Sequence, residues 1–157
     1  MAYARDTAVI ATPIGAVRIT GDTFVHAITI EREALPPRRA GSPAVIAAAE
    51  QLEAWFAGAL TAFDLALLPA RTPRGQALRD GLIAVGYART LSYGTLAQML
   101  DSGPRAIGQL CSRNPFPIVV PCHRVLGAND LGHYSGGNGL ATKRWLIDFE
   151  ARNGACA

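Results

Sequence analysis

Cysteine is scarce in this chain, and its pattern excludes a disulfide framework. The 157 residues contain three cysteines, Cys111, Cys122 and Cys156. An odd number at irregular spacing is not the pattern of a disulfide-stapled fold, and it indicates a reducing compartment. Zinc-ligand spacings such as Cys-x-x-Cys are also missing. We therefore expect no metal site.

Long apolar runs are missing as well. No stretch approaches the roughly 18 residues of a membrane span, and residues 1–6 have no apolar core of the kind found in signal peptides. We therefore expect a cytoplasmic protein with no membrane association.

Acidic residues are outnumbered by basic ones, although not by many. The 15 Lys and Arg residues and 12 Asp and Glu residues give a formal net charge of +3. Such a charge permits a polyanionic partner without requiring one. Several basic residues fall in the half of the chain that carries the motifs described below: Arg105, Arg113, Arg124, Lys143 and Arg144.

The length suits one domain, or a small domain joined to a larger one. Segments at residues 8–11, 16–20 and 24–30 are separated by turn residues and predict antiparallel strands. Ser42 then serves as an N-cap for a helix that begins at Pro43 and carries an apolar stripe to Phe56. We expect an N-terminal domain over residues 1–70, built from a sheet and a helix.

Helices dominate the second half. Thr72 and Pro73 open one helix, Ser92 caps a short one that runs to Leu100, and Pro104 opens another after a turn at residues 101–103. Two short helices across such a turn predict a helix-turn-helix. Prolines bracket a predicted strand over residues 116–120, a glycine-rich loop spans 126–139, and a last helix runs from 140 to about 152. We expect a C-terminal domain over residues 71–157 that is mostly helical with a short strand.

Cys122 carries the strongest chemical signal. An apolar run ends at Pro121, and the thiol is followed at once by His123 and Arg124. The thiolate is the nucleophilic form of cysteine, and neighbouring cations stabilise it. A buried cysteine can instead act as a small hydrophobic residue. Because neighbouring strand residues face opposite sides, Cys122 and His123 cooperate only if the chain turns after Pro121.

Glu150 falls on the apolar face of the last predicted helix. A buried carboxylate needs a hydrogen-bonding or charged partner. Two partners are available. Lys143 lies two turns back on the same face, and His123 could be oriented by Glu150 as an acid orients the base of a catalytic triad.

The segment Pro121-Cys122-His123-Arg124-Val125 resembles the active-site signature of the O6-alkylguanine-DNA alkyltransferases, the methylated-DNA–protein-cysteine methyltransferases. The resemblance is strong over residues 72–152 and weak over the first seventy. Further motifs occur in the family's order and near its spacing: Ser92-Tyr93-Gly94-Thr95-Leu96-Ala97, Arg105-Ala106-Ile107-Gly108, Asn114-Pro115, Tyr134-Ser135-Gly136-Gly137 and the helix from Lys143 to Glu150.

This resemblance implies an α+β fold in two parts, with a ribonuclease H-like N-terminal sheet and helix. It implies DNA repair by direct reversal, in which the alkyl group of O6-alkylguanine, and of O4-alkylthymine, passes irreversibly to Cys122 once per molecule. It also implies double-stranded DNA as the partner, a monomer, and no cofactor. The catalytic residues that it implies are Cys122, His123, Glu150, Tyr93 and Asn114.

The resemblance also implies a DNA-binding surface and a base pocket. Arg105 would fill the gap left by a flipped nucleotide, and Tyr93 would rotate the adjoining phosphate. The implied DNA-binding residues are Arg105, Tyr93, Ala106, Gly108 and Arg124, and the implied pocket residues are Val125, Tyr134, Ser135 and Gly136.

The chain departs from the family in two places. Arg74, Ala77 and Leu78 stand in a helix that usually carries aromatic packing residues, and Leu110 stands where alanine is common. Three other functions remain open: an alkylated-DNA-binding protein without efficient transfer, a cysteine hydrolase built on Cys122, and a DNA-binding regulator that uses only the two short helices. The presence of Cys122 argues against the first of these.

Overall fold

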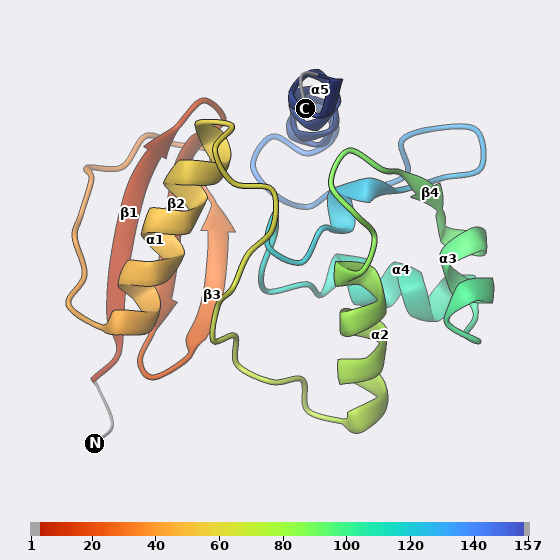
Figure 1. Ribbon diagram of the computed structural model, residues 1–157, viewed down its shortest axis with the longest axis horizontal. Helices are drawn as coiled ribbons and strands as arrows, with labels where there is room; N and C mark the ends of the chain where they lie inside the picture. The colour runs from red at the N-terminus through yellow and green to blue at the C-terminus, as the bar shows by residue number, and fades with distance from the viewer. Residues whose placement is uncertain (1–3, 156–157) are drawn as a thin grey trace. The chain divides into compact units, whose positions relative to one another are not determined.

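The computed structural model describes residues 4–155, and its first elements form a small antiparallel sheet. Strands β1 (Asp6–Thr12), β2 (Gly15–Gly21) and β3 (Val25–Ile30) pair in the order β1-β2-β3 (Figure 1). The β1–β2 hairpin closes where Thr12 pairs with Gly15, and Gly15 takes the positive φ of 107° that this tight turn requires. The three predicted strands are confirmed.

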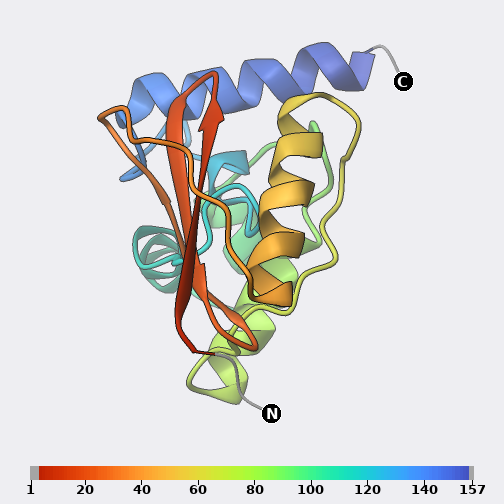
Figure 2. The ribbon, with the colours of Figure 1, turned by 90° about the vertical axis from the view of Figure 1, so that its left-hand side faces the viewer.

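Helix α1 (Pro43–Phe56) covers one face of this sheet (Figure 2). Its buried stripe consists of Val45, Ala48, Leu52 and Trp55, which fill the core between helix and sheet. The predicted cap at Ser42 is wrong in its detail, because the Ser42 hydroxyl donates to the carbonyl of Asp22. The start of the helix is held instead by the Asp6 carboxylate, which accepts the backbone N–H groups of Gly41 and Ser42 at 2.6 and 3.0 Å.

The chain divides into two compact units between Leu68 and Pro69. The second unit contains α2 (Pro73–Ile83), β4 (Leu91–Ser92), α3 (Tyr93–Met99), α4 (Pro104–Ser112), a 3-10 helix (Cys122–Arg124), β5 (Val125–Leu126) and α5 (Leu140–Ala155). Strands β4 and β5 pair in parallel, with Leu91 opposite Val125. The protein is therefore of mixed α+β type, with helices dominating the second unit. Within residues 4–155, no helix is both long and apolar enough to cross a membrane.

Helices α3 and α4 are joined by a tight turn that α2 supports. The Ser92 side chain caps α3 by accepting the N–H of Thr95 at 3.0 Å. At the other end of α3, Asp101 takes a positive φ of 51°, and Arg74 of α2 donates to the carbonyls of Leu100 and Asp101 at 3.2 and 2.8 Å. These carbonyls lie at and just beyond the C-terminal end of α3, where a guanidinium stabilises the helix end.

The segment that leads to Cys122 is a series of turns rather than the predicted strand over residues 116–120. Ile118 has a positive φ of 75°, and the N–H of Val120 donates back to the carbonyl of Phe116 at 2.8 Å. Pro115 and Pro117 provide no N–H groups, so this segment could not form a regular strand ladder. The apolar side chains are nevertheless buried, which explains why the sequence resembles that of a strand.

Candidate active site

Cys122 is the first residue of the 3-10 helix, and only 6% of it is exposed. The chain turns directly after Pro121, because the Cys122 N–H donates to the carbonyl of Val120 at 2.8 Å and the Arg124 N–H donates to that of Pro121 at 3.0 Å. The turn removes the strand alternation that would have separated Cys122 from His123. Burial raises the pKa of the Cys122 thiol.

Asn114 holds this turn and contacts the sulfur. Its Nδ2 donates to the Val120 carbonyl at 2.7 Å and to Cys122 Sγ at 3.2 Å, while its Oδ1 accepts the N–H of Phe116 at 2.9 Å. A donor aimed at the sulfur favours the thiolate, so Asn114 opposes the effect of burial on the pKa of Cys122.

His123 and Glu150 form a buried hydrogen-bonded pair. His123 Nε2 lies 2.8 Å from Glu150 Oε2, with 0% and 2% of the two side chains exposed. The carboxylate acceptor assigns the proton to Nε2 and leaves Nδ1 as the basic nitrogen. Burial lowers the pKa of His123, although Glu150 opposes this. Burial alone would raise the pKa of Glu150, but hydrogen bonds from His123 and Arg124 bring it down to about 2.

Arg124 is a partner of Glu150, and its predicted role in binding DNA is wrong. Its Nε and Nη2 donate to Oε1 and Oε2 of Glu150 at 2.9 and 2.7 Å, and its Nη1 donates to the Val85 carbonyl at 2.6 Å. The residue is 6% exposed. A guanidinium that is buried and bound to a carboxylate cannot reach a phosphate, whereas it can fix the carboxylate in place. Ala88 adds its backbone N–H to Oε1 at 3.3 Å.

Lys143, the alternative partner considered for Glu150, binds elsewhere. The residue is fully buried, and its Nζ donates to the backbone carbonyls of Val125, Leu131 and His133. The bonds to Val125 and His133 measure 2.7 and 3.1 Å. Lys143 therefore fastens the glycine-rich loop to β5. Its positive charge also favours the Cys122 thiolate and so opposes the burial that raises the pKa of Cys122.

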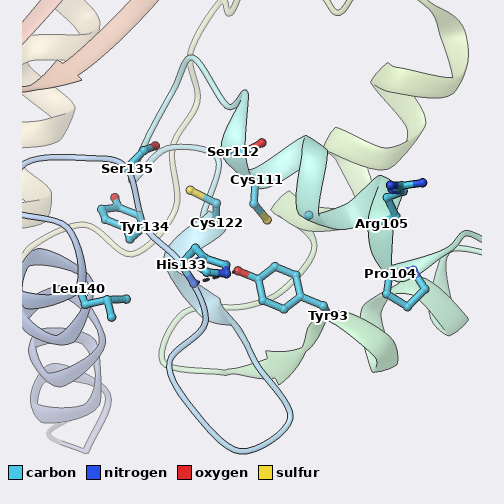
Figure 3. A pocket seen from close by; sticks show the side chains of 11 residues that line it. Tyr93, Pro104, Arg105, Cys111, Ser112, Cys122, His133, Tyr134, Ser135 and Leu140 are labelled. Atoms are coloured by element: carbon cyan, nitrogen blue, oxygen red, sulfur yellow. Dashed lines mark hydrogen bonds between the residues drawn. The ribbon is translucent and has the colours of Figure 1, made fainter.

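The Cys122 side chain lies in a cavity of about 620 Å³ that also contains several other predicted residues. Figure 3 shows Tyr93 and Arg105 on one side of this cavity and Tyr134 and Ser135 on the other. Gly108 lines it as well. Val125 is fully buried and, like Gly136, is not among the lining residues, and Ala106 lines a second groove.

The side chain of Tyr93 is fixed by the glycine-rich loop. The His133 N–H lies 3.5 Å from the Tyr93 hydroxyl, and Gly132, at a φ of 74°, passes so close that a Cβ there would lie 2.8 Å from the ring. Burial raises the pKa of the Tyr93 hydroxyl, so this group stays protonated and can act as a hydrogen-bond donor at neutral pH.

Sequence reasoning missed five residues that line the cavity: Pro104, Cys111, Ser112, His133 and Leu140. Pro104, Cys111 and Ser112, like Arg105, each lie three or four residues from Gly108, which places them on the same side of α4. This spacing could have revealed them. Burial raises the pKa of Cys111 to about 12, so its thiol remains protonated beside Cys122. Within residues 4–155, no group of three metal-ligating side chains is placed to hold an ion, and Cys156 lies outside the described residues.

This arrangement can activate a thiol toward an electrophile. The cavity supplies one buried nucleophile, and the cluster of His123, Glu150 and Arg124 supplies a neutral imidazole whose basic nitrogen is fixed by its other hydrogen bond. Asn114 and Lys143 favour the negative charge that develops on the sulfur.

Comparisons with known proteins agree on one family. The model of the DNA-binding domain of 6-O-methylguanine DNA methyltransferase matches residues 75–152. The methylated-DNA–protein-cysteine methyltransferase of Methanosarcina acetivorans is 40% identical over 112 residues, which cover 69% of each chain. That of Mycobacterium tuberculosis is 36% identical over 147 residues, or 88% of each chain. A crystal structure of M. tuberculosis OGT in complex with DNA superimposes with a TM-score of 0.79 at 33% identity, and covers 94% of this chain and 93% of that one.

Proposed function

Because this chain belongs to the methylated-DNA–protein-cysteine methyltransferase family, we propose that it repairs DNA by transferring an alkyl group from O6 of guanine to Sγ of Cys122. O4-alkylthymine, which presents the same kind of alkyl ether, is the second substrate. The observation that carries this proposal is the position of the Cys122 thiol, which lines an open cavity while the buried His123–Glu150 pair lies behind it.

The damaged nucleotide reaches Cys122 by leaving the duplex. O6 of a stacked guanine is inaccessible, so the base must flip into the cavity. We assign α3, the turn and α4 to a helix-turn-helix that contacts the DNA, with Ala106 and Gly108 close to the DNA backbone. The guanidinium of Arg105 is exposed at the rim of the cavity, where it can occupy the gap and pair with the orphaned base. Tyr93 turns the adjoining phosphate.

The flipped base is held by the loop that Lys143 fastens. Tyr134 and Ser135 line the cavity and contact the ring edge and O6 of the guanine. Gly136 lets the loop backbone approach closely, and the carbonyl of Val125 reads the exocyclic amino group with the lone pair that Lys143 leaves available.

The reaction conserves protons and leaves a stable product. His123 Nδ1 takes the thiol proton through a water, and Glu150 stabilises the imidazolium that results. The thiolate forms a bond to the alkyl carbon as the carbon–O6 bond breaks, and the departing guanine regains a proton with help from the Tyr93 hydroxyl. The thioether on Cys122 has no facile hydrolytic exit, and the neutral thiol of Cys111 is a poor nucleophile. Each molecule therefore reacts once, and the steps need no metal or cofactor.

We assign residues 1–70 to a ribonuclease H-like N-terminal domain and residues 71–157 to the alkyltransferase and DNA-binding domain. We propose that the protein acts as a monomer, in which one chain supplies both the cavity and the cluster behind it. The cytoplasm suits a nucleophile that must remain a reduced thiol.

Intact-mass measurement tests this function. After incubation with excess O6-methylguanine duplex, we expect the protein to gain one methyl group, mapped to Cys122, and the Cys122→Ser variant to gain none. Binding of the duplex without a gain in mass indicates an alkylated-DNA-binding protein, and catalytic turnover of an activated ester indicates a cysteine hydrolase. Either result contradicts the proposal, as does release of more than one repaired guanine per molecule.

A further inference from the structure

A second groove lies along α4, away from the cavity that holds Cys122. It measures about 410 Å³ and is formed by α2, α4 and the segment that follows α4 (α2 and α4 are neighbours in Figure 1). All of its lining residues belong to the second unit. Its lining shares no residue with the cavity that holds Cys122, although Asn114, which lines the groove, also contacts Cys122 Sγ.

The lining of this groove, hereafter the arginine groove, contains Arg74, Arg79 and Arg113 and no carboxylate. The Arg74 guanidinium donates to uncharged backbone carbonyls, so its charge is not neutralised. The Arg79 guanidinium lies 5.2 Å from the centre of the Phe116 ring, and Arg113 is exposed at the end of α4. Among the described residues, no carboxylate forms an ion pair with Arg74 or Arg113. Arg74 and Arg113 therefore give the groove positive charge that no ion pair among the described residues neutralises.

The arginine groove and the cavity lie on different faces of α4. Arg105, Gly108 and Ser112 line the cavity, whereas Ala106, Gln109 and Arg113 line the groove. Each set repeats at three or four residues and is offset from the other by one, so the two sets form separate stripes along the helix. A ligand in the groove therefore contacts a different stripe of α4 from the one that lines the cavity.

A DNA duplex can present one of its two strands to each of these two faces of α4. An element that enters a groove of the duplex has one strand on either side, and the strand that delivers the damaged nucleotide must run past the cavity. We propose that the arginine groove binds phosphates of the opposite, undamaged strand. This inference rests on the proposed function, since it requires α4 to lie between the two strands. Arginine suits this task because its guanidinium donates in pairs to phosphate oxygens.

The experiment compares duplex with single-stranded DNA in a Cys122→Ser background, in which binding proceeds without transfer. Affinity is measured by fluorescence anisotropy for an O6-methylguanine oligonucleotide, alone and paired with its complement, over a range of salt concentrations. We expect Arg113→Gln to weaken duplex binding several-fold and to reduce the slope of log K against log salt by about 1. Single-strand binding should change less than twofold.

Arg152→Gln is the matched control, because Arg152 is exposed on α5 and lies outside the groove, and its replacement removes the same charge. An equal loss on single-stranded and duplex DNA, or a salt slope no different from that of Arg152→Gln, overturns the inference. Methylphosphonate linkages in the undamaged strand should abolish the effect of Arg113→Gln on duplex affinity, and the same linkages in the damaged strand should not. A wild-type protein that never gains an alkyl group contradicts the proposed function itself, which is a separate result.

Discussion

The imidazole of His123 and the carboxylate of Glu150 meet at 2.8 Å in a region that solvent does not reach. The same carboxylate accepts two N–H groups of Arg124, at 2.9 and 2.7 Å. The Glu150 carboxylate thus binds both the Arg124 guanidinium and the His123 imidazole. Hydrogen bonds from His123 and Arg124 keep Glu150 ionised, with a pKa of about 2. Burial lowers the pKa of His123 against the effect of Glu150, so the imidazole is neutral.

Glu150→Gln should keep the shape of the cluster of His123, Glu150 and Arg124 while removing the negative charge of the carboxylate. The imidazolium that forms during the reaction then lacks its counter-ion, so alkyl transfer at neutral pH should slow by roughly 10²–10⁴-fold. The pH dependence of Cys122 alkylation by a small electrophile gives the measurement, and an unshifted thiol titration at an unchanged rate would show that Glu150 has only a structural role.

The same variant tests the effect of acid on stability. The pKa of Glu150 is lower in the folded protein than its ordinary value of 4.5, so the carboxylate stabilises the fold above pH 4.5 and this contribution is lost as the pH falls toward 2. A shift from 4.5 to about 2 corresponds to about 3 kcal/mol of unfolding free energy. Denaturant titrations between pH 6 and pH 3 should show a smaller loss of stability for Glu150→Gln than for the wild type.

Arg124→Met should both destabilise the protein and change its pH profile. Removing one partner of a buried ion pair costs roughly 3–5 kcal/mol. The charges that face His123 are Glu150, Arg124 and Lys143, and Arg124 lowers the pKa of His123. Without Arg124, that pKa should rise, and the acid limb of alkyl transfer should move to higher pH because the imidazole remains protonated.

The double variant Arg124→Met with Glu150→Gln controls for folding, because it leaves no unpaired charge. We expect it to recover much of the melting temperature but not the transfer rate. If Arg124→Met lowers the melting temperature but retains the wild-type pH profile of alkyl transfer, Arg124 has only a packing role.

Lys143→Met should loosen the loop that carries Tyr134 and Ser135. Methionine has a similar length but cannot donate to the carbonyls of Val125, Leu131 and His133, and we expect a loss of about 2 kcal/mol. Loss of the positive charge should also raise the pKa of Cys122. Hydrogen exchange over residues 126–139 measures the first effect and thiol titration the second; unchanged exchange in that loop would contradict the proposed fastening.

Arg105→Ala should separate base flipping from chemistry. Without the guanidinium that fills the gap, repair of O6-methylguanine in duplex DNA should slow far more than transfer from free O6-benzylguanine, which needs no flipping. Single-turnover rates on the two substrates provide the comparison. Equal losses would assign Arg105 to the pocket instead.

Local rules predicted most elements of this fold. Alternation and turn residues located β1 to β3, and a proline at the first helical position located α1, α2 and α4, because these signals act over a few neighbouring residues. The apolar arc of the last helix identified Glu150 as a buried carboxylate, and the structure pairs it with His123. Its catalytic role stays a prediction.

Features that depend on contacts between residues far apart in the sequence were not predicted. The turns over residues 116–120 resemble a strand because burial, not pairing, selects their apolar residues. Arg124 looks like a DNA contact in sequence, and only the approach of Glu150 from 26 residues away shows that it faces inward. Leu110 and the arginines of α2 mark a groove that no local pattern reveals.

The bond between the Ala88 N–H and Glu150 spans 62 residues, and this long reach has a kinetic consequence. Contacts between segments so far apart form after local ones, because closing a long loop is entropically unfavourable. Helices α3 and α4 need only their short turn, so we expect them to form before α5 docks. Until α5 docks, His123 lacks the Glu150 carboxylate that holds its ring. Docking of α5 therefore completes the His123–Glu150 pair, and we expect local detachment of α5 to separate this pair while α3 and α4 remain folded.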